Sequence, residues 1–373
     1  MPDNLLKYQI GITMIKGIGP NLAKNLIAYL GSVEAIFTEK KQNLVKIPGI
    51  GEVLSKEIVS QDVLKRAEKE IEFIEKNKIQ THFFTHKSYP YRLKECPDSP
   101  IMLYYKGNLN LNDGKYVSIV GTRKATESGK AICENIIETL SRKIANLVIV
   151  SGMAYGIDIC SHKAALDCNL PTIGVMGHGL DRVYPPLHRA TAVKMLDCGG
   201  LLTEFMSETN PDRQNFVQRN RIIAGLCDAL LVVESGVKGG ALITADLAND
   251  YNRDVFAVPG RIGDELSGGC NALIKYNKAS LVESAEDIIR LMNWEENKTS
   301  KPAEIIQTTL FENLSEEEYE IIGLLRQNPE GINVNEMTIL LQKPFSKLSS
   351  KLLDMEFRGL TKCLPGGMYK LVR

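Results

Sequence analysis

Several features that would direct an interpretation are absent from the sequence. No run approaches the roughly 18 consecutive apolar residues of a membrane-spanning helix, and the first residues, MPDNLLKYQI, have no secretory pattern. We therefore expect a cytoplasmic protein without a membrane span. The formal net charge is zero, with 45 basic and 45 acidic residues, so a surface that binds a polyanion must concentrate its positive charge locally.

Metal-binding patterns are lacking as well. The eight cysteines are scattered and form no C-x-x-C pair, and we expect free thiols packed in the cores. His82 and His86 have the spacing of metal ligands on a helix, but THFFTHKSYP reads as a strand that leads into a proline. We predict no metal site.

The signature of a dinucleotide cofactor is also missing. SIVGTRKATESGK, residues 118–130, has the pattern of a strand, a glycine turn and a helix, whose N-terminus could hold a phosphate. The turn is not G-x-G-x-x-G, and the next strand ends in Ser151 and Gly152 instead of an acidic residue that would bind a ribose. We predict no cofactor, and the phosphate must belong to another ligand.

Residues 1–80 contain a near-repeat. IKGIGPNLAKNLI at 15–27 is echoed by IPGIGEVLSKEIV at 47–59. Each copy places a G-x-G turn before a helix, which predicts an all-helical helix-hairpin-helix (SAM-like) domain whose turns allow backbone amides to meet a nucleic-acid phosphate. Lysines beside the first turn favour DNA, whereas Glu52 in the second would repel it. DNA contact and a structural or protein-binding role are equal alternatives.

Residues 81–290 alternate short apolar runs with helix-length segments, which predicts an extended, Rossmann-like, doubly wound α/β sheet. The expected strands are 101–105, 116–120, 147–150, 172–176, 200–203, 229–233 and 254–258. Residues 291–313 are polar and irregular, which predicts a linker. Residues 314–373 predict a winged-helix domain of three helices and a hairpin, opened by a capping box at Ser315 and Glu318.

Glycine turns follow four of the expected strands, at residues 121–123, 151–156, 177–179 and 234–240. In a parallel sheet such turns share the edge at which these folds bind ligands. Several turns together make a groove with exposed amides at many points. Arg123, Arg189 and Lys238 could make its surface basic, and Tyr155, Tyr184 and Phe216 could stack bases.

The segment FVQRNRIIAGL, residues 216–226, is expected to open a helix with Arg219, Asn220 and Arg221 in its first turns. Cations at that end of a helix cost about a few tenths of a kcal/mol each, so an anion or an acidic group should offset them. A DNA phosphate and a salt bridge within the fold are equal alternatives for each arginine.

A catalytic interpretation is weaker. Asp158 and His162 lie one helical turn apart and could form a base oriented by an acid. Such a pair more often caps and packs the start of a helix. We predict no catalytic residue.

Eight segments occur in an order that is highly specific. They are YPYRLKECPDSPIMLYYKG, SIVGTRKATESGK, VSGMAYGIDICSHKAAL, TIGVMGHGLDRVYP, GLLTEF, FVQRNRIIAGLCDALLVVES, GGALITADLA and RDVFAVPG. With them the chain resembles the DprA/Smf family of DNA-processing proteins over essentially its whole length. The resemblance implies a cytoplasmic protein, not an enzyme, that binds single-stranded DNA during natural transformation, dimerises, shields that DNA and delivers it to the RecA recombinase.

The resemblance also assigns residues. Arg123 of the GTR turn matches the family's phosphate-binding arginine, and Arg189 after YPPLH matches the other basic position of the DNA pocket. Two departures are His188, where asparagine is common, and GGA before LIT, where the family has serine-glycine-serine. The family dimer implies a homodimer interface at about Leu266 to Tyr276.

The candidate DNA-binding residues are Gly121, Thr122, Arg123, Ser151, Gly152, Arg189, Phe216, Arg219, Asn220, Arg221, Lys238, Gly239, Gly240 and Thr244. Two other functions stay open. Phosphoribohydrolase-like Rossmann enzymes hydrolyse nucleotides, but SGVKGGALITADLA lacks the catalytic glutamate of their P-G-G-x-G-T-x-x-E segment. A winged-helix transcription or adaptor protein is the other alternative, although its candidate recognition helix in KPFSKLSSKLLDMEFRGL has only a moderate basic excess.

Overall fold

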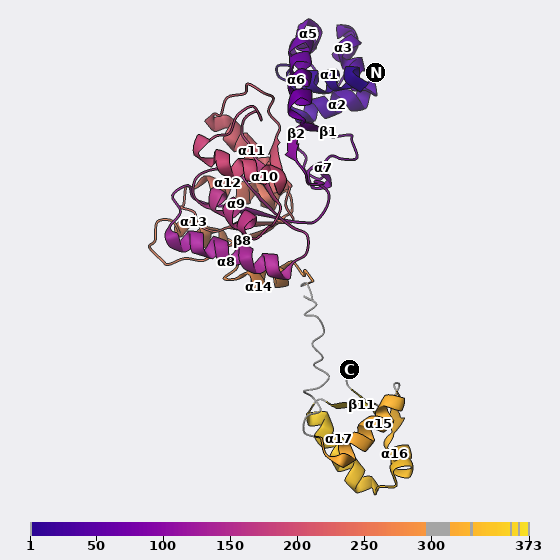
Figure 1. The fold of residues 1–373 in the computed structure, drawn as a ribbon. Coiled ribbons are helices and arrows are strands. Elements are labelled where there is room, and N and C mark those ends of the chain that lie inside the picture. Colours follow the sequence, from indigo (N-terminus) through magenta and orange to yellow (C-terminus); the bar gives the residue numbers. More distant parts are fainter. Residues whose placement is uncertain (1, 296–313, 329–330, 359, 365, 372–373) are drawn as a thin grey trace. The chain divides into compact units, whose positions relative to one another are not determined.

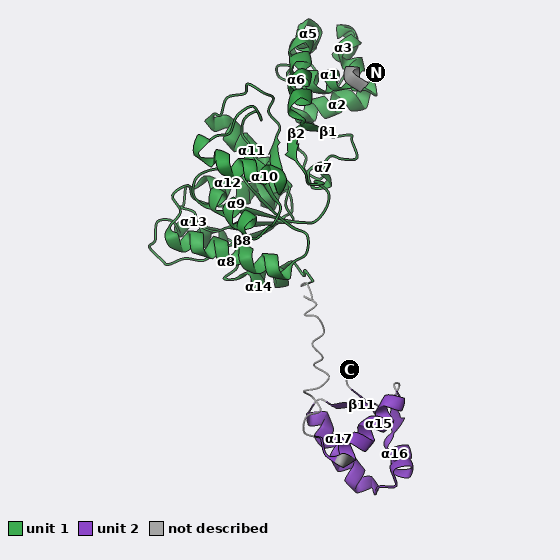
Figure 2. Ribbon diagram, viewed as in Figure 1, with its two compact units in different colours: residues 1–298 green, residues 299–373 purple. Residues whose placement is uncertain are grey.

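The computed structural model describes residues 2–295, 314–328, 331–358, 360–364 and 366–371. The chain divides into two compact units, residues 1–298 and residues 299–373 (Figure 2). In the described ranges, no helix combines the length and the apolar character needed to cross a membrane.

The N-terminal part of the first unit is helical, as predicted. Its helices are α1 (Pro2–Ile12), α2 (Pro20–Leu30), α3 (Val33–Thr38), α4 (Lys41–Leu44), α5 (Glu52–Ser60) and α6 (Leu64–Asn77). Figure 1 shows them gathered beside β1 (Gln80–Phe83) and β2 (Met102–Gly107). Ile12, Leu26 and Ile36 are buried in their shared core.

The two predicted hairpins pack against each other. Gly17 and Gly49 have φ values of 81° and 85°, a region that favours glycine. A Cβ atom on Gly17 would lie 2.7 Å from Leu54 of the second repeat, and one on Gly49 would lie 2.9 Å from Leu22 of the first. Both glycines are therefore explained by packing within the helical region.

A mixed sheet follows. Its further strands are β3 (Lys115–Val120), β4 (Leu147–Ser151), β5 (Thr172–Val175), β6 (Gly199–Thr203), β7 (Ala229–Val232), β8 (Asp254–Ala257) and β9 (Ser280–Leu281). Among the described residues the strand order is β1-β2-β6-β5-β4-β3-β7-β8-β9. Strands β3 to β9 pair in parallel, and β1 and β2 are antiparallel additions at one edge. All the expected strands are present. Strand β1 overlaps THFFTHKSYP, which reads as a strand, whereas the outermost strand β9 was not predicted.

Helices cover both faces of this sheet, so the doubly wound, Rossmann-like prediction is confirmed. They are α7 (Tyr91–Lys94), α8 (Glu127–Lys143), α9 (Ile157–Asp167), the short 3-10 helix Pro186–His188, α10 (Arg189–Asp197), α11 (Arg213–Gly225), α12 (Gly240–Asp250), α13 (Gly268–Lys275) and α14 (Ala285–Leu291). Buried residues of α11 and α12, such as Ile222 and Ala245, pack on one face. Those of α8, α9 and α14, such as Ile137 and Ile288, pack on the other.

The predicted linker begins too early in the sequence. Met292 and Trp294 pack against the core that includes α14, and the Lys115 ammonium lies 5.4 Å from the centre of the Trp294 ring. These apolar side chains continue the folded unit past residue 291. The remainder of the predicted linker, residues 296–313, lies outside the described residues.

The second unit contains α15 (Glu316–Gln327), β10 (Ile332–Asn333), α16 (Val334–Leu341), α17 (Phe345–Phe357), β11 (Thr361–Leu364) and β12 (Met368–Leu371). Its described strands pair antiparallel in the order β10-β12-β11. The predicted capping box is present, with the Ser315 amide donating to Glu318 Oε2 at 2.7 Å. The expected helices and hairpin are all found, and β10 is an addition. The winged-helix assignment itself stays a prediction.

Candidate functional site

The glycine turns lie together at the carboxyl edge of the sheet, where a parallel arrangement places them. Strand β3 pairs in parallel with β4 and with β7, and β4 pairs in parallel with β5. The Thr122 amide donates to the carbonyl of Glu234 at 2.8 Å, and the Thr122 carbonyl accepts from the amide of Ile157 at 3.2 Å. Three turns are thus joined directly by backbone hydrogen bonds.

The start of α8 is already occupied by an acidic side chain. The Glu234 carboxylate accepts from the Thr126 amide at 2.9 Å and from the Thr126 hydroxyl at 2.5 Å. That hydroxyl in turn accepts from the Gly129 amide at 2.9 Å and caps the helix. A Cβ atom on Gly129 would overlap the Glu234 carboxyl group. Glu234 therefore takes the place that the sequence assigned to a phosphate, and its role was missed because the contact joins distant segments.

Gly121 and Thr122 determine the shape of the glycine turn at residues 121–123. A Cβ atom on Gly121 would lie 2.5 Å from Cγ1 of Ile157, so glycine allows the turn to approach α9. The Thr122 hydroxyl accepts from the Lys124 amide at 3.2 Å. Both residues shape the loop that presents Arg123, and the Thr122 amide is committed to Glu234.

Helix α11 starts earlier than predicted, at Arg213, because Asp212 accepts from the Asn215 amide at 2.8 Å and caps it. The two arginines expected in its first turns therefore lie in its middle, and the electrostatic cost assigned to them was wrong. The carboxylate that a helix start favours is supplied by Asp212.

Arg219 points into the fold. It is 4% exposed, and its Nη1 donates to the carbonyl of Gly152 at 2.7 Å and to the carbonyl of Val175. It thereby ties together the carboxyl ends of β4 and β5. Burial lowers the pKa of Arg219 to about 10, and the nearby Asp158 carboxyl opposes that shift. Its Nη1 is already hydrogen-bonded to these carbonyls, so Arg219 stabilises the carboxyl edge of the sheet from the interior.

Arg221 forms a salt bridge within the fold, the second of the two alternatives given for it. It is buried and forms an ion pair with Glu204, which also accepts from the Gln218 amide at 3.1 Å. Burial raises the pKa of Glu204, while the Arg221 charge opposes this. The Asn220 side chain, half-buried, accepts from Arg219 Nε at 3.3 Å. The positive charge predicted from this segment is therefore largely internal.

Ser151 and Gly152 are also buried. The Ser151 hydroxyl donates to the Ile119 carbonyl at 2.6 Å. A Cβ atom on Gly152 would lie 2.7 Å from both Arg219 Nη2 and Asp158 Oδ2. Glycine at this position leaves room for the buried charges of Arg219 and Asp158.

Asp158 and His162 face the interior, as the packing interpretation expected. Burial raises the pKa of Asp158, and its carboxylate accepts from the Ala154 amide at 3.4 Å. His162 Nδ1 lies 2.7 Å from the Thr172 hydroxyl, and burial lowers the pKa of His162 to about 3. The buried, neutral imidazole of His162 lies in the middle of α9 and is held by Thr172 of β5.

Three predicted cations are exposed at the same edge. Arg123 follows β3, Arg189 begins α10, and Lys238 precedes α12. Within the described part of the chain, none of these side chains has a hydrogen-bond or ion-pair partner. The Arg123 charge also lowers the pKa of Arg219, a smaller effect than burial, so the exposed cation lies near the buried one.

Two tyrosine rings are exposed at the same edge. Tyr184 is 44% exposed and stacks on Phe216 with 5.8 Å between ring centres. A Cβ atom on Gly177 would lie 2.7 Å from the Phe216 ring. Tyr155 is similarly exposed and meets His188 edge-on at 5.0 Å. His188, the departure from the family pattern, donates from Nδ1 to the Met153 carbonyl at 2.7 Å, which fixes its ring below Tyr155.

The turn before α12 is open on one side. Gly239 caps the helix without a side-chain hydrogen bond, and a Cβ atom on Gly240 would meet nothing within 4 Å. Gly239 itself is constrained, because a Cβ atom there would overlap the Ser235 hydroxyl. Thr244 is buried on α12, one turn farther along. With Gly239 and Ala241 where the family has serine, these two positions carry no hydroxyl group, and Gly240 is exposed at the start of α12.

Metal-binding groups were not predicted. Among the described residues, no three His, Cys, Asp or Glu side chains gather in a way that would hold a metal ion. His82 lies in β1 with Nδ1 3.0 Å from the Ser88 hydroxyl, and His86 contacts the Gln9 amide.

Known protein families match both parts of the first unit. A family model described as DNA recombination-mediator protein A matches residues 80–293. The chain belongs to this family. A model for a SAM-like helix-hairpin-helix tandem matches residues 11–61, in agreement with the predicted repeat.

Relatives and solved structures agree with the family assignment. Protein Smf of Synechocystis sp. is 35% identical over 296 residues, covering 78% of this chain and 73% of that protein. DNA processing protein DprA of Streptococcus pneumoniae is 42% identical over 201 residues, covering 54% and 70%. The X-ray structure of DNA processing protein A from S. pneumoniae matches with a TM-score of 0.67 at 33% identity, covering 76% of this chain and 97% of that chain. A Helicobacter pylori structure, which concerns the single-stranded DNA binding mode of DNA processing protein A, matches with a TM-score of 0.52 at 27% identity, covering 58% and 96%.

Proposed function

We propose that this protein binds single-stranded DNA along the carboxyl edge of its sheet. The observation that carries the proposal is the set of exposed, unpartnered cations, Arg123, Arg189 and Lys238, on the same edge as the exposed Tyr155 and Tyr184. Cations hold the phosphates and exposed rings stack the bases, which is how sequence-tolerant single-strand binding works. The H. pylori relative described by its single-stranded DNA binding mode supports the same ligand.

The division between exposed and buried groups makes this proposal specific. Contacts to DNA come from Arg123, Arg189, Lys238, the exposed rings and the amides at Gly240. The other predicted residues hold that surface in place from the interior: Gly121, Thr122, Ser151, Gly152, Phe216, Arg219, Asn220, Arg221, Gly239 and Thr244. The predicted DNA-binding set thus becomes an outer set that contacts the strand and an inner set that positions it.

Titration of labelled single- and double-stranded oligonucleotides at several salt concentrations tests the proposal. Wild type should bind single strands with an affinity that falls steeply with salt. Arg123→Ala should weaken binding and reduce the salt slope by about one. Arg142→Ala is the matched control, because Arg142 is exposed in the last turn of α8, at the opposite edge of the sheet. Equal affinity in Arg123→Ala and wild type would overturn the assignment.

The cellular role proposed with this activity is protection of incoming DNA and its delivery to RecA during natural transformation, in the cytoplasm. The family membership supports it. RecA-dependent strand exchange on DNA coated with a single-strand-binding protein tests it, since a mediator should shorten the delay before exchange begins. No acceleration at any ratio of protein to RecA would remove this part of the proposal.

We also propose a homodimer through about Leu266 to Tyr276. Exposed apolar side chains support it, because Ile262 is fully exposed and Tyr276 is 67% exposed beside α13. Burial of these two side chains in a dimer would remove apolar surface from water, which favours association. Sedimentation of wild type and of Tyr276→Glu should give a dimer and a monomer, respectively. A monomeric wild type would contradict this interface.

A non-enzymatic role is part of the proposal. The buried and neutral His162 supports it, because the only acid-base pair singled out in the sequence faces the core. Incubation with nucleoside monophosphates tests the phosphoribohydrolase alternative. Release of free base at a rate that depends on the protein would restore the enzyme interpretation.

The second unit is proposed to be a winged-helix domain that is accessory to DNA binding. The lysines of α17 support this role, because Lys347 pairs with Glu317 at 2.6 Å and Lys351 lies 3.3 Å from Glu318. The positive charge of the candidate recognition helix is thereby balanced within the unit. A truncation after Trp294 should retain single-strand affinity. Loss of affinity in a folded truncation would favour the adaptor or transcription alternative.

A further inference from the structure

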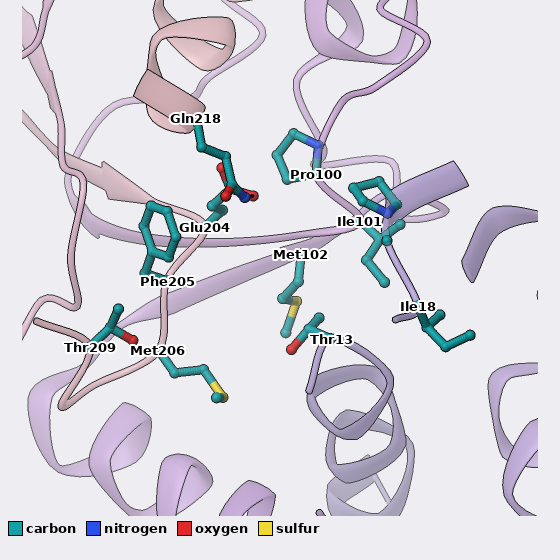
Figure 3. A pocket seen from close by; sticks show the side chains of 12 residues that line it. Thr13, Ile18, Pro100, Ile101, Met102, Glu204, Phe205, Met206, Thr209 and Gln218 are labelled. Atoms are coloured by element: carbon teal, nitrogen blue, oxygen red, sulfur yellow. Dashed lines mark hydrogen bonds between the residues drawn. The ribbon is translucent and has the colours of Figure 1, made fainter. Parts of the chain in front are cut away.

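A pocket of about 250 Å³ lies between the first hairpin and the sheet edge. Thr13 and Ile18 line it from the helical region, and Glu204, Phe205 and Gln218 line it from the segment after β6 and from α11 (Figure 3). The pocket therefore exists only because the helical region packs against the sheet.

The wall formed after β6 is held rigidly by α6. The Ser207 amide donates to Glu70 Oε1 at 2.9 Å, and the Ser207 hydroxyl donates to Glu70 Oε2 at 2.5 Å. Arg66 donates to the Ser207 carbonyl at 2.7 Å and pairs with Glu70. This buried cluster fixes the loop in position, so the pocket is preformed.

One oxygen in the pocket lacks a partner. Glu204 has a side chain that is 9% exposed, and its Oε2 contacts Gln218 and Arg221. Its Oε1 is buried and has no hydrogen-bond partner among the described residues. Figure 3 shows the ends of Glu204 and Gln218 meeting on one side of the pocket, with Thr13 on the opposite side. Buried acceptors are almost always hydrogen-bonded, so we expect a ligand in the pocket to donate a hydrogen bond to this oxygen.

The remaining walls of the pocket indicate which kind of ligand would carry that donor. Ile18, Phe205 and Met206 are apolar, and an apolar pocket with a few convergent polar groups is the usual setting for a ring-shaped ligand. Gln218 is two residues from Phe216, which stacks on Tyr184. Helix α11 therefore contributes a side chain to the pocket and another to the ring pair at the sheet edge.

We propose that this pocket receives one nucleobase of the bound strand and prefers a base with an exocyclic amino group, which donates to Glu204 Oε1. A carboxylate that accepts from the amino group of cytosine is an established form of base readout. The inference rests on the proposed single-strand binding and adds a preference that the cationic edge would not supply.

Two oligonucleotides of equal length test it: oligo(dT) and a strand of alternating dT and dC. Both bases are pyrimidines. Cytosine has an amino group where thymine has a carbonyl oxygen, and thymine also carries a methyl group on its ring. Wild type should bind the dT/dC strand about tenfold more tightly, the worth of one hydrogen bond to a charged acceptor.

Thr13→Leu fills the pocket without touching the ion pair of Glu204, and it should abolish the preference while leaving oligo(dT) affinity unchanged. Thr38→Leu is the matched control. Both hydroxyls donate to the carbonyl three residues earlier, and Thr38 lies away from the pocket. Glu204→Gln should also reduce the preference, and its unfolding is measured because it disrupts the pair with Arg221.

The outcomes are distinguishable. A preference for the dT/dC strand that Thr13→Leu removes and Thr38→Leu retains supports the base pocket. Equal affinities in wild type, or a preference that survives Thr13→Leu, overturn the pocket while single-strand binding stands. Failure of wild type to bind either strand overturns the proposed function and the pocket together.

Discussion

The exposed arginines at the sheet edge and the buried arginines beneath it behave as opposite kinds of residue. Arg123 and Arg189 are exposed and lack partners among the described residues, whereas Arg219 and Arg221 are buried among carbonyls and a carboxylate. All four were candidates for the same ligand from sequence. The difference teaches that the surface proposed to bind DNA has charge in two places: exposed arginines that can contact the polymer, and buried arginines that hold the turns in position.

The largest effect that tests this comparison is on stability. Arg219→Leu should lower the free energy of unfolding by about 3–5 kcal/mol, because it leaves buried carbonyls unpaired and removes the cation near Asp158. Urea unfolding measures the change. Arg189→Leu is the matched control, since an exposed, unpartnered arginine should change stability by no more than about 0.5 kcal/mol. Similar losses for the two variants would remove the distinction between the inner and outer arginines.

A pH effect of intermediate size concerns the buried His162. Its pKa is lowered to about 3 from 6.5, so between these values the unfolded chain binds a proton that the folded chain does not. The contribution of neutral His162 to the free energy of unfolding is therefore fully present above pH 6.5. It is lost as the pH falls. Between pH 6.5 and 5 the loss should be about 2 kcal/mol.

Unfolding of wild type and His162→Gln in buffers across this pH range measures that contribution. The variant keeps a side chain that can hydrogen-bond to Thr172 and loses the titration, so its stability should fall less on acidification. Parallel curves for the two proteins would show that His162 does not contribute in this way.

The fold was largely predictable because its signals are local. Short apolar runs separated by helix-length segments marked the strands β2 to β8, and G-x-G turns marked both hairpins. The edge strand β9 was harder, because an edge strand needs little apolar sequence and its assignment depends on its neighbour in the sheet. β9 spans only Ser280–Leu281, both exposed.

The orientation of side chains was less predictable than the elements. Arg219 lies three and four residues before the buried Ile222 and Ile223, so helical spacing places all three on one face. That spacing indicates burial, and it favours contacts within the fold over a DNA phosphate, the two alternatives given as equal for each arginine. Asp212 before Arg213 likewise fits an N-cap. No local signal links Glu234 to Thr126, because a fold-level contact brings them together.

A smaller stability effect tests the carboxylate at the start of α8. Gly129→Ala should destabilise the protein by about 1–3 kcal/mol, because the added methyl group overlaps the Glu234 carboxyl group in a packed site. Urea unfolding again measures the change. Ser128→Ala, at an exposed position in the same turn, is the control and should be nearly neutral. Tolerance of alanine at Gly129 would mean that Glu234 is free to move away.

The smallest stability effect is expected for Arg123→Ala, which tests an exposed arginine of the comparison. The side chain is exposed and has no hydrogen-bond or ion-pair partner among the described residues, so unfolding should change by less than about 0.5 kcal/mol. Its removal should also relieve the repulsion between its charge and that of Arg219. The same variant should reduce the salt slope of DNA binding by about one. A stability loss comparable to that of Arg219→Leu would place Arg123 in the inner set and leave the outer surface without its central cation.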